Sequence, residues 1–188
     1  MWQATRLAMI GDALVARLWL GRLVVLGVAA AILFIALVPL GFTPRFLPRP
    51  DILLCLSFAV ALRRPEFLPV WLLAAIFLLA DILLLRPPGL WTAIVILAIE
   101  FARNQEYRFR EAVFPFEWLF VAGIMFLAML ANRLVLTMVF LPVPGFGSEM
   151  LYFVVTALVY PIVVAFVSVV LRIRKISPDE AVLLGHRL

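Results

Sequence analysis

Uninterrupted apolar runs are the feature that most constrains this chain. The stretch from Leu23 to Gly41 holds no charged residue, and similar runs recur along all 188 residues, separated by joints rich in Arg and Pro. Strands of a membrane β-barrel alternate apolar and polar residues, so they would not produce continuous apolar stretches. Because 66% of the residues are hydrophobic, only 14% are charged and the mean hydropathy is +1.18, a soluble globular fold is excluded. The sequence predicts an all-α integral membrane protein.

The runs predict a single membrane domain built as a bundle of six transmembrane helices. Each crossing needs about 20 residues, so a chain of this length has no room for a sizeable soluble domain. We expect residues 1–22 to form an N-terminal interfacial or cytoplasmic segment and residues 172–188 to form a cytoplasmic tail. The expected spans are residues 23–41, 50–62, 67–85, 90–102, 113–136 and 150–171.

Two parts of this division leave alternatives open. The segment 1–22 mixes apolar with polar residues, which suits a helix lying at the membrane interface, but it could also be a helical extension of the first span. No small-residue cleavage site follows the first run, so we expect an uncleaved span rather than a signal peptide. The fifth run contains Asn132 and Arg133; it is either one tilted helix or a helix that ends near Arg133 and resumes as an interfacial piece.

The second and fourth spans are shorter than a bilayer requires. As a helix, residues 51–62 would cover only about 18 Å of the roughly 30 Å of hydrocarbon. The second span must therefore borrow flanking residues, thin the bilayer or be sheltered by the rest of the protein.

The distribution of Lys and Arg predicts the orientation. With six spans, 12 of these cations fall on one side of the membrane, whereas only Arg45, Arg49 and Arg86 fall on the other. Loops rich in Lys and Arg stay in the cytoplasm, so both termini are expected there. This arrangement accounts for the net charge of +5 better than a nucleic-acid partner would, because the cations lie at span ends and form no single patch.

Ionisable residues at membrane depth are candidates for function, because placing one in hydrocarbon costs about 3 kcal/mol or more. Asp51 opens the second span and Asp81 lies near the end of the third. Each could act in function, or could simply form an interfacial pair, Asp51 with Arg45 or Arg49 and Asp81 with Arg86.

Two further sites carry charge. Glu100 stands three residues before Arg103, a spacing that predicts either a helical ion pair or a cap of the adjoining loop. Arg133 lies within an apolar stretch and needs a carboxylate, backbone carbonyls or the headgroup layer around it, and Asp81 is a candidate partner.

The residues of this sequence give little support for an enzymatic function. The sole histidine is His186, the sole cysteine is Cys55, and there is no catalytic triad, metal cluster or phosphate-binding loop, so we expect no enzyme, metal or cofactor. Channels and proton-coupled transporters would need more polar residues inside the spans. Two classes remain open: a scaffold for other membrane proteins, or a binding module for a small apolar or amphipathic ligand.

Two stretches carry a family resemblance. Arg49-Pro50-Asp51-Ile52-Leu53-Leu54 enters the second span, and Asp81-Ile82-Leu83-Leu84-Leu85-Arg86-Pro87-Pro88-Gly89-Leu90 closes the third. They resemble the rod shape-determining protein MreD family, which shows a Pro-Asp-Leu-Leu pattern and an Asp-Leu-Leu, Pro-Leu-Gly pattern at these places. Pro88 replaces the usual Leu, which affects only the local turn.

The resemblance implies a non-enzymatic subunit of the bacterial elongation machinery in the inner (plasma) membrane. Its partners would be MreC and, directly or indirectly, MreB, RodA and a penicillin-binding transpeptidase of peptidoglycan synthesis. The fold would be similar to the S component of energy-coupling-factor vitamin transporters. The partner-binding or structural candidates are Asp51, Asp81, Arg86, Pro87, Gly89, Glu100, Arg103 and Arg133.

The competing hypothesis is an S-component-like subunit that binds a small molecule such as a vitamin. It would need a polar pocket near the extracellular ends of the spans. The residues that could line such a pocket are Asp51, Asp81, Arg86, Thr92 and Arg133.

Overall fold

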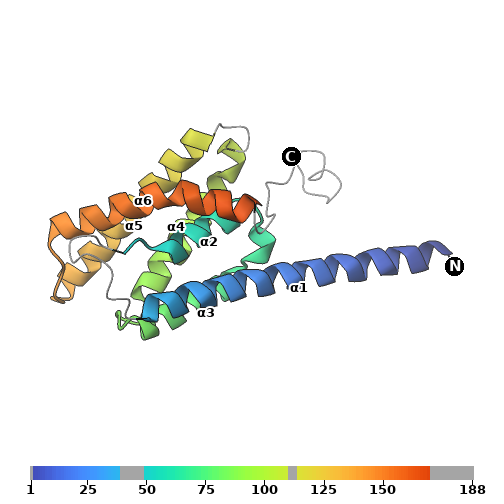
Figure 1. The fold of residues 1–188 in the computed structure, drawn as a ribbon, viewed down its shortest axis with the longest axis horizontal. Coiled ribbons are helices and arrows are strands. Elements are labelled where there is room, and N and C mark those ends of the chain that lie inside the picture. The colour runs from blue at the N-terminus through green and yellow to red at the C-terminus, as the bar shows by residue number, and fades with distance from the viewer. Residues whose placement is uncertain (1, 39–48, 110–113, 170–188) are drawn as a thin grey trace.

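The computed structural model describes residues 2–38, 49–109 and 114–169, and these ranges contain helices and turns but no strand. The expectation of an all-α fold is thereby confirmed for the described residues (Figure 1). The elements in chain order are α1 (Trp2–Leu37), α2 (Ile52–Ala61), the short 3-10 helix η1 (Pro65–Phe67), α3 (Val70–Leu83), α4 (Leu90–Phe109), α5 (Phe114–Met138) and α6 (Phe146–Val169). The expected tail, 172–188, lies outside the described residues.

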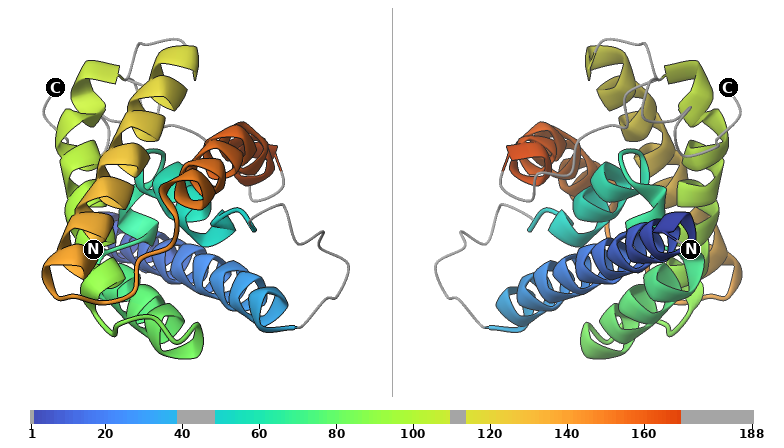
Figure 2. Two further views of the ribbon diagram at one scale, coloured as in Figure 1. Left: turned by 90° about the vertical axis from the view of Figure 1, so that its left-hand side faces the viewer. Right: turned by 90° about the vertical axis from the view of Figure 1, so that its right-hand side faces the viewer.

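Helix α2 occupies the centre of the fold. All nine residues from Leu53 to Ala61 are buried, and α2 contacts α1, α4 and α6 (Figure 2). Phe58 and Ala59, midway along the helix, are completely buried. The rest of the protein therefore shelters this short apolar helix, which is one of the three possibilities expected for the short second span.

Helix α1 is continuous from Trp2 to Leu37, so residues 2–22 are a helical extension of the first apolar run and do not form a separate helix. Its N-terminal half projects away from the other helices (Figure 1). The part of α1 that packs on the bundle does so through Val25, Ala29 and Leu33, which are spaced four residues apart and are all buried. Over residues 15–37, the remaining faces of this helix are largely exposed.

Helix α4 extends to Phe109, seven residues beyond the expected end of the fourth span at residue 102. The polar residues after Ala102, which were expected to lie outside the fourth span, continue the helix up to Phe109. Arg, Gln and Glu have good helix propensity, so a polar stretch can continue an apolar helix without a break. The ion pair between Glu100 and Arg103 lies within this continuous helix.

Helices α5 and α6 are the long helices of the C-terminal half. Helix α5 runs without interruption past Asn132 and Arg133, so the single-helix alternative describes this stretch. Helix α6 begins at Phe146, four residues earlier than expected, because the carbonyl oxygen of Gly145 accepts hydrogen bonds from the amides of Ser148 and Glu149 and so starts the first turn.

Three segments are long and apolar enough to cross a membrane, which supports a membrane protein: Val15–Leu37 of α1, α5 and α6. Helices α2 and α3 are equally apolar but shorter, with 10 and 14 residues. At 1.5 Å per residue, α3 covers about 21 Å.

Candidate functional site

Two clusters of polar side chains lie at opposite ends of α2. We call the first the Asp51 cluster, made of Asp51, Asp81, Arg86, Thr92, Tyr152 and Thr156, and the second the Arg63 cluster, made of Arg63, Glu117 and Tyr160. Asp51 precedes the first residue of α2 and Arg63 follows its last turn, so the helix separates the clusters by about 18 Å.

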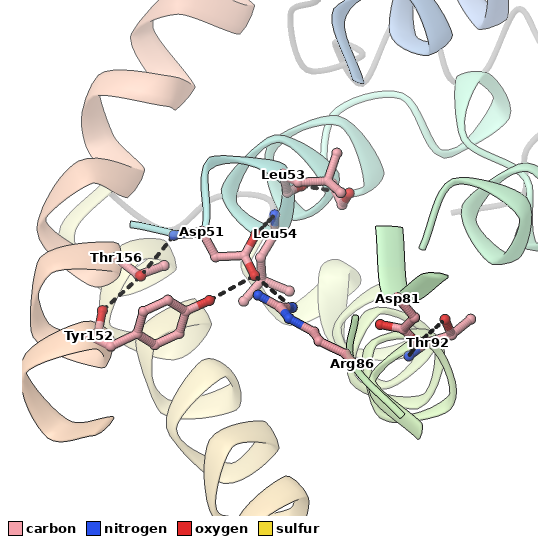
Figure 3. A network of polar contacts seen from close by, with 9 residues as sticks. Asp51, Leu53, Leu54, Asp81, Arg86, Thr92, Tyr152 and Thr156 are labelled. Atoms are coloured by element: carbon pink, nitrogen blue, oxygen red, sulfur yellow. Dashed lines mark hydrogen bonds and ion pairs between the residues drawn. The ribbon is translucent and has the colours of Figure 1, made fainter. Parts of the chain in front are cut away.

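Asp51 ties the start of α2 to α6 (Figure 3). Its Oδ1 accepts a hydrogen bond from the amide of Leu54 at 2.9 Å, which is the geometry of an N-cap. Its Oδ2 accepts a bond from the hydroxyl of Tyr152 at 2.8 Å, and its backbone amide donates to Oγ1 of Thr156 at 3.1 Å. Asp51 thus binds an unpaired amide at the start of α2 and holds α6 beside it.

Asp81 performs a similar task for α4, although it lies on α3. The residue is completely buried, and its Oδ2 accepts bonds from the amide of Gly89 at 3.1 Å and from the amide and hydroxyl of Thr92 at 3.2 and 2.8 Å. A carboxylate at a helix N-terminus satisfies unpaired amides and interacts favourably with the helix dipole. The Oδ1 of Asp81 has no hydrogen-bond partner within the described part of the chain.

The turn between α3 and α4 carries the other residues of the second family-like stretch. Gly89 has a φ of +88°, a conformation that glycine adopts without steric cost. Pro87 lies in the same turn, where its carbonyl oxygen accepts a bond from the amide of Leu90. The backbone amide of Arg86 donates to the carbonyl oxygen of Asp81 at 2.9 Å.

Arg86 joins Asp51, and the predicted side-chain pair of Arg86 with Asp81 is wrong. Its Nη1 lies 3.8 Å from Oδ2 of Asp51, and its guanidinium lies over the ring of Trp91 at 5.9 Å. The turn directs the Arg86 side chain towards α2, while Asp81 faces α4 (Figure 3). Arg49 donates to the carbonyl oxygen of Ala36 at 3.3 Å. The alternative partner of Asp51, Arg45, lies outside the described residues.

The Arg63 cluster joins α2 to α5 and α6 in the interior. Nη1 of Arg63 lies 3.0 Å from Oε1 of Glu117, and the two side chains are only 7% and 4% exposed. The hydroxyl of Tyr160 donates to the same carboxylate oxygen at 3.3 Å. Sequence reasoning missed this cluster, because Arg63 and Glu117 are 54 residues apart. The available signal was Glu117 itself, a carboxylate inside an apolar run that requires a cation.

The remaining predicted charges divide into one confirmed pair and one corrected pair. Glu100 and Arg103 form the expected ion pair at 2.5 Å, and Arg103 also donates to the carbonyl oxygen of Leu68. Arg133 pairs with Glu149 at 2.5 Å, and not with Asp81, the candidate partner that the sequence offered. The early start of α6 places Glu149 in its first turn, facing α5, and so supplies the nearer carboxylate.

A cavity of about 370 Å³ lies between α4, α5, α6 and their connecting turns. Of the residues that the sequence offered as pocket lining, only Arg86 lines it; Asp51, Asp81, Thr92 and Arg133 do not. Its lining residues are Arg86, Pro87, Leu90, Trp91, Met129, Asn132, Leu136, Pro144, Ser148, Glu149 and Tyr152.

Among the described residues, no group of three or more His, Cys, Asp or Glu side chains could hold a metal ion. Comparison with known proteins gives no relative: no family model, no curated protein and no solved structure matches this chain.

Proposed function

We propose that this chain is a non-enzymatic scaffold subunit of the bacterial elongation complex, similar to the MreD family, which binds MreC and supports lateral peptidoglycan synthesis and rod shape. MreB, RodA and a penicillin-binding transpeptidase would be direct or indirect partners. The proposal rests on the two family-like stretches, 49–54 and 81–90, and on what their polar residues do in the fold.

The contact between Asp51 and Arg86 is the observation that carries the proposal. It joins the two stretches, which are far apart in sequence, at one end of the bundle. Asp51 caps α2, and Asp81 caps α4. The distinctive residues of both stretches therefore hold helix ends in place, as a rigid frame for other proteins requires.

The outer surface of such a frame would be its working surface. Large apolar side chains are exposed on α1, α4, α5 and α6, where lipid or a transmembrane helix of MreC could pack: Leu20, Leu23, Leu97, Leu119, Leu127, Leu158 and Ile162.

The proposal includes six crossings of the inner membrane with both termini in the cytoplasm. In that orientation the Arg63 cluster lies near the cytoplasmic face and the Asp51 cluster near the periplasmic face. The basic residues Arg22, Arg63 and Arg103 all lie at the Arg63 end of α2 or contact the η1 and α3 region beside it, in agreement with a positive cytoplasmic side.

Copurification from detergent tests the scaffold function. We expect the tagged chain to retain MreC through size-exclusion chromatography when both are expressed together. A chain that elutes alone with and without MreC would contradict the proposal.

A matched set of substitutions tests which helix face contacts MreC. Leu20→Trp on α1, Leu127→Trp on α5 and Leu158→Trp on α6 each enlarge an exposed apolar side chain without changing charge. Because a transmembrane partner packs closely, one of the three should lower MreC recovery several-fold while the other two leave it unchanged. Equal recovery with all three variants would exclude these faces as the contact.

A further inference from the structure

The cavity between α4, α5 and α6 has the composition of a binding site. At about 370 Å³ it falls within the range of small-molecule pockets, near the lower end. Leu90, Met129 and Leu136 give it an apolar wall, and Arg86, Asn132 and Tyr152 bring polar groups to the same space. Such a combination suits a ligand with one polar end and one apolar end.

The polar groups of the cavity favour an anion. Asp51 already accepts bonds from Leu54 and Tyr152, whereas its distance to Arg86 is 3.8 Å, beyond hydrogen-bond length. The Arg86 guanidinium also interacts with the Tyr152 hydroxyl and lies over the ring of Trp91. Arg carries five N–H donors in a planar fork that matches the oxygens of a phosphate. Arg86 therefore has donors to spare at the cavity wall.

Glu149 does not oppose an anion in this cavity. It also lines the wall, but Arg133 binds its Oε2 at 2.5 Å and neutralises its charge. The Glu149 side chain is only 13% exposed.

The turns beside the cavity are strained. Leu85, directly before Arg86, has a φ of 54°, and Phe140, between Leu136 and Pro144, has a φ of 57°. In each turn the next residue's amide bonds to the carbonyl five residues back, Arg86 to Asp81 and Leu141 to Leu136, which is the Schellman motif that normally places Gly at this position. The side chains of Leu85 and Phe140 are 93% and 96% exposed. Strain of this kind concentrates at functional sites.

We propose that this cavity binds a phosphate-bearing amphiphile, with the phosphate on Arg86 and the hydrocarbon along Leu90, Met129 and Leu136. The same chemistry could come from an anionic phospholipid or from a soluble phosphate ester. The site does not depend on MreC and is separate from the exposed apolar surface assigned to that partner.

Native mass spectrometry of the full chain in detergent tests the proposal. The probes are lysophosphatidylglycerol, lysophosphatidylcholine with the same acyl chain, and glycerol phosphate. We expect lysophosphatidylglycerol to bind at least tenfold more tightly than lysophosphatidylcholine, whose choline cancels the charge. Glycerol phosphate binding at similar strength would identify a soluble ester as the source, and its failure to bind would identify the lipid; both support the site.

Two variants connect binding to this cavity. Arg86→Gln removes the anion-binding group and should weaken binding at least tenfold, while Arg17→Gln, which removes an exposed cation from α1, should leave it unchanged. Leu136→Trp fills the cavity and keeps Arg86, so it should also abolish binding even if Arg86→Gln fails to fold. Undiminished binding in Leu136→Trp, equal affinity for both lysolipids, or saturable binding of a vitamin without any amphiphile would overturn the proposal. MreC is absent from this assay, so its result is independent of the scaffold function.

Discussion

The two polar clusters use the same residue types for different purposes. In the Asp51 cluster, aspartates cap helix ends: Asp51 accepts a hydrogen bond from one backbone amide and Asp81 from two. In the Arg63 cluster, one carboxylate meets one guanidinium in the interior, with Tyr160 as a third member. A cap can lose one bond and keep others, whereas a buried ion pair that loses one member leaves an uncompensated charge. Substitutions in the Arg63 cluster should therefore lower the stability of the protein more than substitutions in the Asp51 cluster.

Glu117→Leu should have the largest effect on stability. It leaves Arg63 buried without its carboxylate, which costs about 3–5 kcal/mol. The double variant Arg63→Met/Glu117→Leu removes both charges and should recover most of that loss, because apolar residues can replace a buried pair at little cost. Thermal unfolding in detergent measures both. A double variant no more stable than Glu117→Leu would show that the pairing is not what makes this site sensitive.

Asp81→Ala should have the next largest effect. It removes the side chain that accepts bonds from Gly89 and Thr92, and loss of a helix cap costs about 1–2 kcal/mol. Asp81→Asn keeps an acceptor oxygen and serves as the matched variant, with an expected loss of less than half as much. If both substitutions lower the unfolding temperature equally, the negative charge matters and the capping hydrogen bonds do not.

The contact between Asp51 and Arg86 should contribute less to stability than the Arg63–Glu117 pair or the Asp81 cap. The atoms are 3.8 Å apart and the Arg86 side chain is 36% exposed, so we expect a coupling energy of about 1 kcal/mol or less. A double-mutant cycle with Asp51→Asn and Arg86→Gln gives this value, and the same cycle on Arg63 and Glu117 should give more than about 2 kcal/mol. A larger coupling energy for Asp51 and Arg86 than for Arg63 and Glu117 would contradict the view that the Arg63 cluster matters more for stability.

Leu85→Gly should produce the smallest effect, and with the opposite sign. Glycine removes the cost of the left-handed conformation, so stability should rise by about 1 kcal/mol or less. Leu97→Gly is the control, because Leu97 is also exposed but lies in the interior of α4, where glycine costs about 1 kcal/mol. A decrease in stability with Leu85→Gly equal to that of Leu97→Gly would show that the Leu85 side chain itself stabilises the fold.

The sequence could predict the contacts between neighbouring residues, but not those that depend on how the helices pack. Apolar runs and local spacing gave the helical class, most helix positions and the Glu100 to Arg103 pair, because these depend on neighbouring residues. The partners of Arg63, Arg86 and Arg133 depend on how helices pack, and no local pattern carries that information. The length of α4 was underestimated because polar residues that favour helices also occur in loops.

Thiol labelling in intact bacterial cells tests most directly whether the two clusters lie on opposite faces of the membrane. The wild-type chain has only Cys55, which is buried and serves as the unlabelled background. Gly145→Cys lies at the Asp51 end, in an open position before α6, and Glu66→Cys lies at the Arg63 end, in η1. With a membrane-impermeant maleimide, we predict that Gly145→Cys reacts in intact cells and Glu66→Cys reacts only after permeabilisation. Labelling of both from the same side, or the reverse pattern, would contradict the account.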